Sequence, residues 1–177
     1  MLKVTECELE GLKIIEPQVF ADDRGWFMEL YRKEDYEEAG ICCEFVQDNR
    51  AYSKQGVLRG MHFQVKYPQD KLLSVLRGEI YDVAVDIRKD SKTYGKWFGI
   101  RLSDENKKQV FIPKGFAHGY LVLSKEAEIL YKCSEIYHPE DEGGIAWDDP
   151  KLAIQWPISV QSELIISEKD RNWEGLL

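Results

Sequence analysis

Three histidines, His62, His118 and His138, are the residues of this chain best suited to proton transfer. An unperturbed imidazole titrates near pH 6.5, so it can accept and release a proton close to neutrality. His62 and His118 lie in glycine-containing segments, GVLRGMHFQ over 56–64 and PKGFAH over 113–118. His138 instead stands beside a proline among several acidic residues, which favours a solvated loop position. The first two histidines are therefore candidate bases, metal ligands or hydrogen-bonded core residues.

The two histidine segments resemble the two sequence motifs of the cupin superfamily. In the first motif five residues separate Gly from His, as they separate Gly56 from His62, and residues 113–118 match the second pattern, PxGxxH. The usual first motif continues with a second His and a Glu, and these hold a metal together with the second-motif His. Gln64 and Lys71 stand at those positions here, and an ammonium group repels a cation. The resemblance thus implies a jelly roll whose cavity binds no metal.

Short apolar or alternating runs separated by turn residues predict a chain built mainly of strands. We expect these strands over Leu12–Ile15, Trp26–Tyr31, Val57–Phe63, Leu72–Leu76, Glu79–Ile87, Phe98–Leu102, Val110–Ile112, Gly119–Leu123 and Glu128–Cys133. A short helix is expected over Arg32–Ala39, because Gly40 can supply its left-handed cap. The predicted fold is all-β, a double-stranded β-helix or cupin-like jelly roll with a few short peripheral helices. We expect a single domain over residues 1–177.

The predicted strand over 79–87 has the clearest alternation. Its two faces carry Tyr81, Val83, Val85 and Ile87 on one side, and Asp82, Ala84, Asp86 and Arg88 on the other. Side chains of a strand point alternately to opposite faces, so one of the two is expected to be core. The charged residues of the other face are interpreted as a structural ladder of Asp82, Asp86 and Arg88.

Composition and charge narrow the classes of partner. The net charge of −8 is spread along the chain, which argues against nucleic acid or an anionic membrane surface as a partner. No apolar run approaches the roughly 20 residues of a membrane span, and residues 1–11 lack a signal-peptide pattern. The four cysteines include no CxxC spacing and are expected to be reduced. A cytoplasmic location is therefore expected.

Longer blocks of sequence, spread over nearly the whole chain, carry a more specific resemblance. They are DRGWFME at 23–29, QDN at 47–49, GVLRGMHFQ at 56–64, DVAVDIR at 82–88, IPKGFAHGY at 112–120, YK at 131–132, WDDP at 147–150 and SEKD at 167–170. Together they resemble the dTDP-4-dehydrorhamnose 3,5-epimerase family. The resemblance implies an isomerase that inverts C3 and C5 of dTDP-4-dehydro-6-deoxy-glucose and needs no cofactor. Its product, dTDP-4-dehydro-L-rhamnose, serves dTDP-rhamnose biosynthesis.

The resemblance also implies roles for four residues in catalysis. His62 matches the base, and Asp170 matches the carboxylate that fixes its tautomer and stabilises the imidazolium. Tyr131 matches the acid that protonates the opposite face of the sugar, with Tyr137 as an alternative acid. Lys71 is expected to stabilise the oxyanion at C4, together with His118 unless that imidazole only hydrogen-bonds within the barrel.

Further positions match ligand contacts of the family. The resemblance assigns the diphosphate to Arg24, Arg59 and Lys169, the thymine ring to Tyr137, and polar contacts to Glu29, Gln47, Asn49 and Glu142. In the family, residues of the segment 24–29 reach into the site of a partner subunit. A homodimer that binds a dTDP-sugar is therefore expected.

Several alternatives stay open from the sequence. Simple alternation places Arg59 opposite His62, so its phosphate role requires a bulge at Gly60. Lys169 and Asp170 could instead belong to an exposed helix cap. The chain could invert only one centre of a related nucleotide sugar, or bind nucleotide sugars or carbohydrates without turnover. A metal-dependent cupin isomerase or oxygenase is disfavoured by the residues at the two lost ligand positions.

Overall fold

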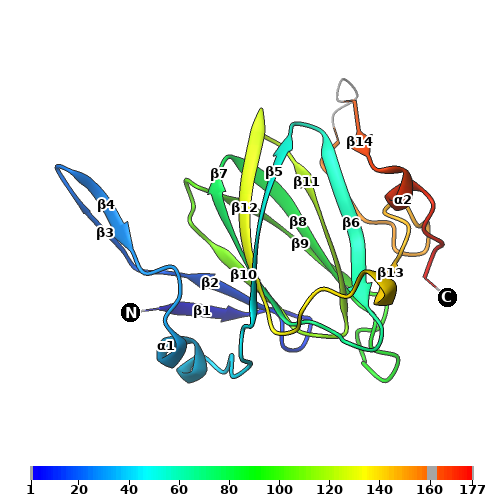
Figure 1. The fold of residues 1–177 in the computed structure, drawn as a ribbon, viewed down its shortest axis with the longest axis horizontal. Helices are drawn as coiled ribbons and strands as arrows, with labels where there is room; N and C mark the ends of the chain where they lie inside the picture. Colours follow the sequence, from blue (N-terminus) through cyan, green and yellow to red (C-terminus); the bar gives the residue numbers. More distant parts are fainter. Residues whose placement is uncertain (1, 159–162, 177) are drawn as a thin grey trace.

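The computed structural model describes residues 2–158 and 163–176, which form two β-sheets packed face to face (Figure 1). One sheet has the order β1 (Lys3–Glu6), β2 (Lys13–Glu16), β10 (Gln109–Ile112), β7 (Lys71–Arg77), β12 (Glu126–Cys133) and β5 (Gln47–Lys54). The facing sheet has the order β13 (Glu142–Gly144), β6 (Val57–Gln64), β11 (Phe116–Val122), β8 (Glu79–Asp86) and β9 (Trp97–Ser103), and β14 (Ile165–Ile166) pairs in parallel with β6. This architecture confirms the predicted all-β jelly roll.

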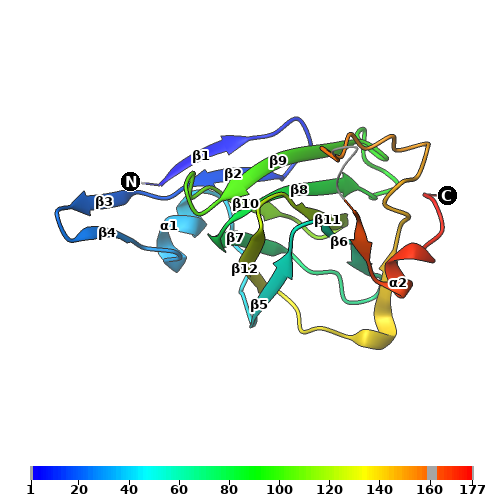
Figure 2. The ribbon, with the colours of Figure 1, turned by 90° about the horizontal axis from the view of Figure 1, so that it is seen from above.

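The remaining elements lie at the edges of the two sheets. They are the hairpin of β3 (Val19–Asp22) and β4 (Gly25–Met28), the helices α1 (Lys33–Glu38) and α2 (Glu168–Arg171), and the 3-10 helix Pro139–Asp141. The hairpin projects away from the body of the molecule, and α2 lies beside β6 at the opposite end (Figures 1 and 2). Helix α1 confirms the helix predicted before Gly40. Within the described ranges, no helix is long and apolar enough to cross a membrane.

Each of the strands predicted from sequence is present, although several differ at their ends. The strand predicted over Trp26–Tyr31 stops at Met28. Other strands were not predicted: β1, β3, β5, β13 and β14. Strand β5 matters most for function, because its inward side chains face the polar part of the interior.

The main apolar core fills one end of the space between the sheets. It includes Leu12, Leu73, Ile80, Ala84, Leu102, Val110, Ile112, Phe116, Val122, Ala127 and Ile129. Full burial of a side chain such as Leu or Ile contributes about 2 kcal/mol to stability. This end of the sandwich therefore holds the two sheets together, and the other end can carry polar groups.

The two faces of β8 pack against different parts of the molecule. Val83 and Val85 pack outside the sheet, beneath the segment that carries Ile145 and Leu152. The opposite face points between the sheets, and its Ala84 belongs to the main core. Both faces of β8 are therefore buried: the apolar face predicted from sequence is core beneath the C-terminal segment, and the opposite face is buried between the sheets as well.

Strands β6 and β11 shift register at Gly60, and the predicted phosphate role of Arg59 requires such a bulge. His118 pairs with His62, but Tyr120 pairs with Arg59, so two residues of β6, Gly60 and Met61, lie opposite one residue of β11, Gly119. Gly60 has φ +115°, and a Cβ there would lie 2.6 Å from the Cα of Gly119. Only glycine allows this approach. The bulge brings both His62 and Arg59 to the inner face.

We predict that Gly60→Ala lowers the free energy of unfolding by about 3 kcal/mol, because it adds a main-chain clash to an unfavourable φ. Gly40→Ala is the control: its φ is +79°, but a new Cβ would come no closer than 3.6 Å to a flexible lysine side chain. That variant should lose only about 1 kcal/mol. Urea unfolding measures both values. Equal losses in the two variants would contradict the proposed close contact of β6 with β11.

Candidate active site

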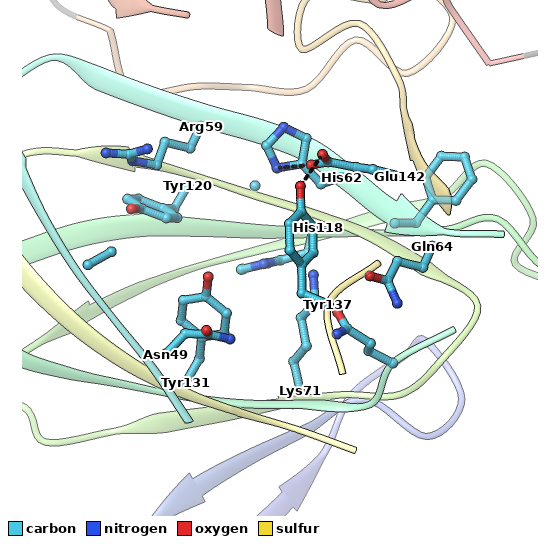
Figure 3. A pocket seen from close by; sticks show the side chains of 14 residues that line it. Asn49, Arg59, His62, Gln64, Lys71, His118, Tyr120, Tyr131, Tyr137 and Glu142 are labelled. Atoms are coloured by element: carbon cyan, nitrogen blue, oxygen red, sulfur yellow. Dashed lines mark hydrogen bonds and ion pairs between the residues drawn. The ribbon is translucent and has the colours of Figure 1, made fainter. Parts of the chain in front are cut away.

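A cavity of about 270 Å³ lies between the two sheets, at the polar end of the sandwich (Figure 3). Its walls include eight of the residues singled out from the sequence: Asn49, Arg59, His62, Lys71, His118, Tyr131, Tyr137 and Glu142. They come from both sheets and from the segment that connects β12 to β13. The structure therefore gathers most of the predicted site in one place.

His62, on β6, forms a close pair with Asp170 of α2. The His62 Nε2 lies 2.6 Å from Asp170 Oδ1, and the Asp170 side chain is buried, since the residue is 3% exposed. Burial by itself raises the pKa of Asp170, but hydrogen bonds from His62 and from the Gly60 N–H outweigh it and hold that pKa below its usual value. An ionised Asp170 accepts a hydrogen bond from the Nε2–H of His62. The Nδ1 atom of the neutral imidazole is then free to accept a proton.

Helix α2 holds the Asp170 carboxylate in place. The Ser167 side chain caps the helix by accepting a hydrogen bond from the Asp170 N–H at 3.1 Å. Asp170 points inward from this turn, whereas Lys169 points to the rim. The alternative that these two residues form an exposed cap is therefore wrong for Asp170.

Tyr131 approaches the cavity from β12, in the sheet opposite His62 (Figure 3). Burial, with smaller contributions from the neighbouring Cys133 and Tyr120, raises the pKa of Tyr131 to about 12. The phenol is thus protonated at neutral pH and carries a proton that it can donate. An imidazole and a phenol therefore face each other across one cavity.

Lys71 reaches the same cavity from β7, beside Cys133 of β12. Burial lowers the pKa of its ammonium group, although the charges of Asp82 and Glu142 oppose that shift. Within the described part of the chain, the Lys71 ammonium group forms no hydrogen bond or ion pair. Its charge is available to a negative group inside the cavity.

His118 forms a second pair of imidazole and carboxylate. Its Nε2 lies 2.7 Å from Asp82 Oδ2, and both side chains are buried. Asp82 was interpreted from sequence as part of a ladder with Asp86 and Arg88, and this was wrong. Only Asp86 binds Arg88, with 2.8 Å between Arg88 Nη2 and Asp86 Oδ2. The pairing of β8 with β11, which sequence alone does not reveal, brings Asp82 to His118.

The rim of the cavity holds a network of charged and polar groups. Glu142 Oε2 accepts hydrogen bonds from Tyr137 Oη and from Lys169 Nζ, each at 2.7 Å, and Glu142 Oε1 lies 3.7 Å from His62 Nδ1. Burial raises the pKa of Glu142, but these partners outweigh it and lower the pKa overall. The hydrogen bond to Glu142, together with burial, raises the pKa of Tyr137 to about 12.

Arg59 of β6 and Asn49 of β5 also line the cavity, and Gln47 of β5 contacts two of its lining residues. Arg59 donates from Nε to the buried Ser53 hydroxyl at 3.1 Å. Gln47 donates to Asn49 Oδ1 at 2.8 Å and accepts from the Tyr137 N–H at 2.9 Å. Ser53 was not anticipated, because a serine in a strand gives no signal of its own in a sequence.

Two predicted ligand contacts lie elsewhere in the molecule. Arg24 is on the projecting hairpin, paired with Asp22 at 2.5 Å between Nη2 and Oδ2. Glu29 follows the hairpin, and its carboxylate lies 3.9 Å from the guanidinium of Arg32. Neither residue lines the cavity.

The residues at the lost metal positions serve other purposes. The Gln64 side-chain amide forms hydrogen bonds with backbone groups of the rim, and Lys71 is a cation. Among the described residues, no group of three or more His, Cys, Asp or Glu side chains is arranged to hold a metal ion. The donor set suits acid–base chemistry instead.

A jelly roll with a His–Asp pair facing a half-buried phenol across a polar cavity defines the class of cupin-like acid–base epimerases. Residues 6–177 match the model of the dTDP-4-dehydrorhamnose 3,5-epimerase family. The chain belongs to this family, as the sequence blocks predicted.

Individual relatives agree with this assignment. A protein of Methanothermobacter thermautotrophicus named dTDP-4-dehydrorhamnose 3,5-epimerase is 58% identical over 171 residues, covering 97% of this chain and 92% of that protein. The crystal structure of dTDP-6-deoxy-D-glucose-3,5-epimerase RmlC from Legionella pneumophila, in complex with dTDP-4-keto-L-rhamnose, is 50% identical. It matches with a TM-score of 0.96 over 99% of this chain and 93% of that chain. ChmJ, a 3'-monoepimerase from Streptomyces bikiniensis, is 33% identical with a TM-score of 0.89, covering 96% of this chain and 86% of that chain.

The lowered pKa of Asp170 predicts how stability depends on pH. A carboxylate with a depressed folded pKa stabilises the fold above its unfolded pKa of about 3.9, and this contribution disappears as pH falls through the folded pKa. Asp170→Asn should therefore lower the free energy of unfolding by about 2 kcal/mol at pH 7, and the difference should shrink below about pH 4.

Urea unfolding across this pH range measures the effect. Asp48→Asn is the control, because Asp48 is exposed and pairs with Lys132 at the surface, so its removal should change stability little. A difference between wild type and Asp170→Asn that stays constant down to about pH 2 would contradict an ionised pair.

Proposed function

We propose that the protein converts dTDP-4-dehydro-6-deoxy-glucose to dTDP-4-dehydro-L-rhamnose by inverting C3 and C5. The observation that carries this proposal is the position of His62 and Tyr131 on opposite sheets, facing one cavity. Inversion requires a base on one face of the sugar and an acid on the other. The family and the ligand of the Legionella structure support the choice of substrate.

The proposed reaction begins with loss of a proton beside the ketone. The C3 and C5 hydrogens are both alpha to the C4 carbonyl, so either anion is stabilised as an enolate. His62 Nδ1 removes the proton, and Asp170 stabilises the imidazolium through Nε2. Lys71 supplies positive charge to the enolate oxygen, and His118 donates to it or orients it. Because the cavity is partly closed to water, these charges act more strongly than in solution.

The second half of the proposed reaction is protonation from the opposite side. Tyr131 gives its phenolic proton to the enolate carbon, which regenerates the ketone with inverted configuration. A phenol with a pKa of about 12 is a weak acid, but an enolate carbon is a strong proton acceptor. The imidazolium then releases its proton to solvent and the phenolate takes one up, so the same pair can act at C3 and at C5 once the sugar ring presents each carbon to it.

We assign the nucleotide to the rim. Arg59 presents a guanidinium fork suited to phosphate, and Lys169 adds a second cation. Tyr137 provides an aromatic face for the thymine ring. Gln47, Asn49 and Glu142 supply polar contacts, which orient the ligand so that the sugar enters between His62 and Tyr131.

Inversion of a single centre is the second candidate, because ChmJ, a monoepimerase by its description, shares this fold at 33% identity. The two outcomes differ in which carbon exchanges its hydrogen with solvent. Incubation in heavy water followed by NMR resolves C3 from C5. Deuterium at only one carbon would establish the single-centre enzyme and exclude the double epimerase.

We predict that His62→Ala lowers both deuterium incorporation and epimerisation by at least about 100-fold, because the base is lost. Tyr131→Phe should lower epimerisation by a similar factor but retain measurable deuterium incorporation, since His62 still removes and returns the proton on its own face.

Tyr52→Phe is the matched control for loss of a phenol. Tyr52 is exposed on β5 and hydrogen-bonds Glu126 on the surface, so turnover should not change. Unchanged turnover in His62→Ala with intact dTDP binding would remove the proposed base and favour a binding protein.

A homodimer completes the proposal. The projecting hairpin exposes large apolar side chains: Phe20 is 53% exposed, Trp26 58% and Phe27 63%. Such a patch favours burial against another protein. We propose that this hairpin packs on a second copy and that Arg24 and Glu29 contact the ligand in that copy's cavity.

The free thiols of Cys7, Cys42, Cys43 and Cys133 support a reducing, cytoplasmic location.

We predict that Trp26→Ser shifts the protein from dimer to monomer in sedimentation velocity at micromolar concentration and raises KM about tenfold or more. Tyr52→Ser, which removes an exposed aromatic residue from β5, should leave the sedimentation coefficient unchanged. A wild-type protein that sediments as a monomer would contradict this part of the proposal.

A further inference from the structure

Gln64 ends strand β6, two residues beyond His62, and is only 6% exposed. Its side-chain Nε2 donates to the carbonyl oxygens of Tyr67, at 2.7 Å, and Ile136, at 3.2 Å. Its Oε1 accepts from the His138 N–H at 2.8 Å. Both amide hydrogens are therefore used, and all three partners are backbone groups.

Two of these bonds flank Tyr137. Gln64 donates to the carbonyl of Ile136, the residue before Tyr137, and accepts from the N–H of His138, the residue after it. The Tyr137 N–H itself donates to Gln47 Oε1 at 2.9 Å. Gln47 belongs to β5 and Gln64 to β6, so the glutamines come from opposite sheets. The backbone on either side of the Tyr137 ring is thus fixed from both walls of the cavity.

The same loop has further contacts that depend on this arrangement. The Tyr67 ring stacks on His138, with 4.2 Å between ring centroids, and Gln64 binds the backbone of both residues. Gln64 is also the direct partner of Glu142 in the ladder of β6 and β13. Gln64 therefore fixes the loop before and after Tyr137, as well as the start of the strand that carries Glu142.

From this geometry we infer that Gln64 is a positioning residue, which acts on nucleotide binding by setting the orientation of Tyr137. The inference rests on the proposed function, in which Tyr137 faces the nucleobase. Gln64 makes no bond to His62, Asp170, Lys71 or Tyr131, so the proton-transfer groups keep their geometry without it. Its loss should weaken binding and leave the chemical step intact.

The test is a double-mutant cycle between Gln64→Met and Tyr137→Ala, with dTDP affinity measured by calorimetry. Methionine has a similar length but makes none of the three hydrogen bonds. Gln64→Met should raise the Kd for dTDP and the KM of turnover about tenfold, with kcat within about twofold of wild type. In the Tyr137→Ala background the same change should raise Kd less than about twofold, because the effect passes through the missing ring.

Gln55→Met is the control for loss of a glutamine-to-carbonyl bond, since Gln55 binds the Leu123 carbonyl on the surface. It should leave Kd, KM and kcat unchanged. Gln64→Glu keeps the acceptor for the His138 N–H but loses both donors, so it should raise Kd in the same direction. This variant replaces Gln64→Met in the cycle if thermal unfolding shows that the methionine protein is not folded.

Three outcomes would overturn the role of Gln64: an unchanged Kd, equal increases in Kd with and without the Tyr137 ring, or a loss confined to kcat. Each of them leaves the proposed function standing, provided that the wild type binds dTDP and epimerises its sugar. A wild-type protein that does neither would overturn the proposed function, and the role of Gln64 with it.

Discussion

The close approach of β6 and β11 at Gly60 and Gly119 is the constraint on which the site depends. Side chains of a regular strand alternate between faces, so Arg59 and His62 would otherwise point in opposite directions. The extra residue of β6 changes this relation, and both side chains enter the same cavity. The same contact brings the Gly60 N–H to Asp170, so one backbone distortion serves the guanidinium, the imidazole and the carboxylate together.

The strands with an apolar face could be predicted from sequence, whereas the polar wall of the cavity could not. Strand β5 has the sequence QDNRAYSK, in which both faces are largely polar, because its inward side lines the site instead of the core. Asp170 lies 108 residues from His62 in the chain, so no spacing rule relates them, and only the family resemblance paired them. Asp82 required the register of β8 against β11, which follows from the closed fold and not from local sequence.

Burial of so many ionisable groups is tolerated because nearly every one has a partner. Asp170 binds His62, Asp82 binds His118, and Glu142 binds Lys169 and Tyr137. Lys71 differs, since in the described part of the chain its ammonium forms no hydrogen bond or ion pair. Burial of that charge costs stability, as its lowered pKa shows. A negative charge that develops on a ligand oxygen offsets this cost, so the least satisfied cation stands where the proposed enolate forms.

The C-terminal segment shows how stability and catalysis share the same contacts. A helix of four residues such as α2 is not stable by itself, so tertiary contacts must hold it. These contacts are the pairing of β14 with β6, the Ser167 cap, the Trp173 ring against Gly144, and the bond between Asp170 and His62. The carboxylate that orients the proposed base is therefore itself held partly by that base. Loosening of the C-terminal segment would free the His62 imidazole to rotate and would remove the charge that stabilises its protonated form. The strength of the proposed base therefore depends on the order of this segment.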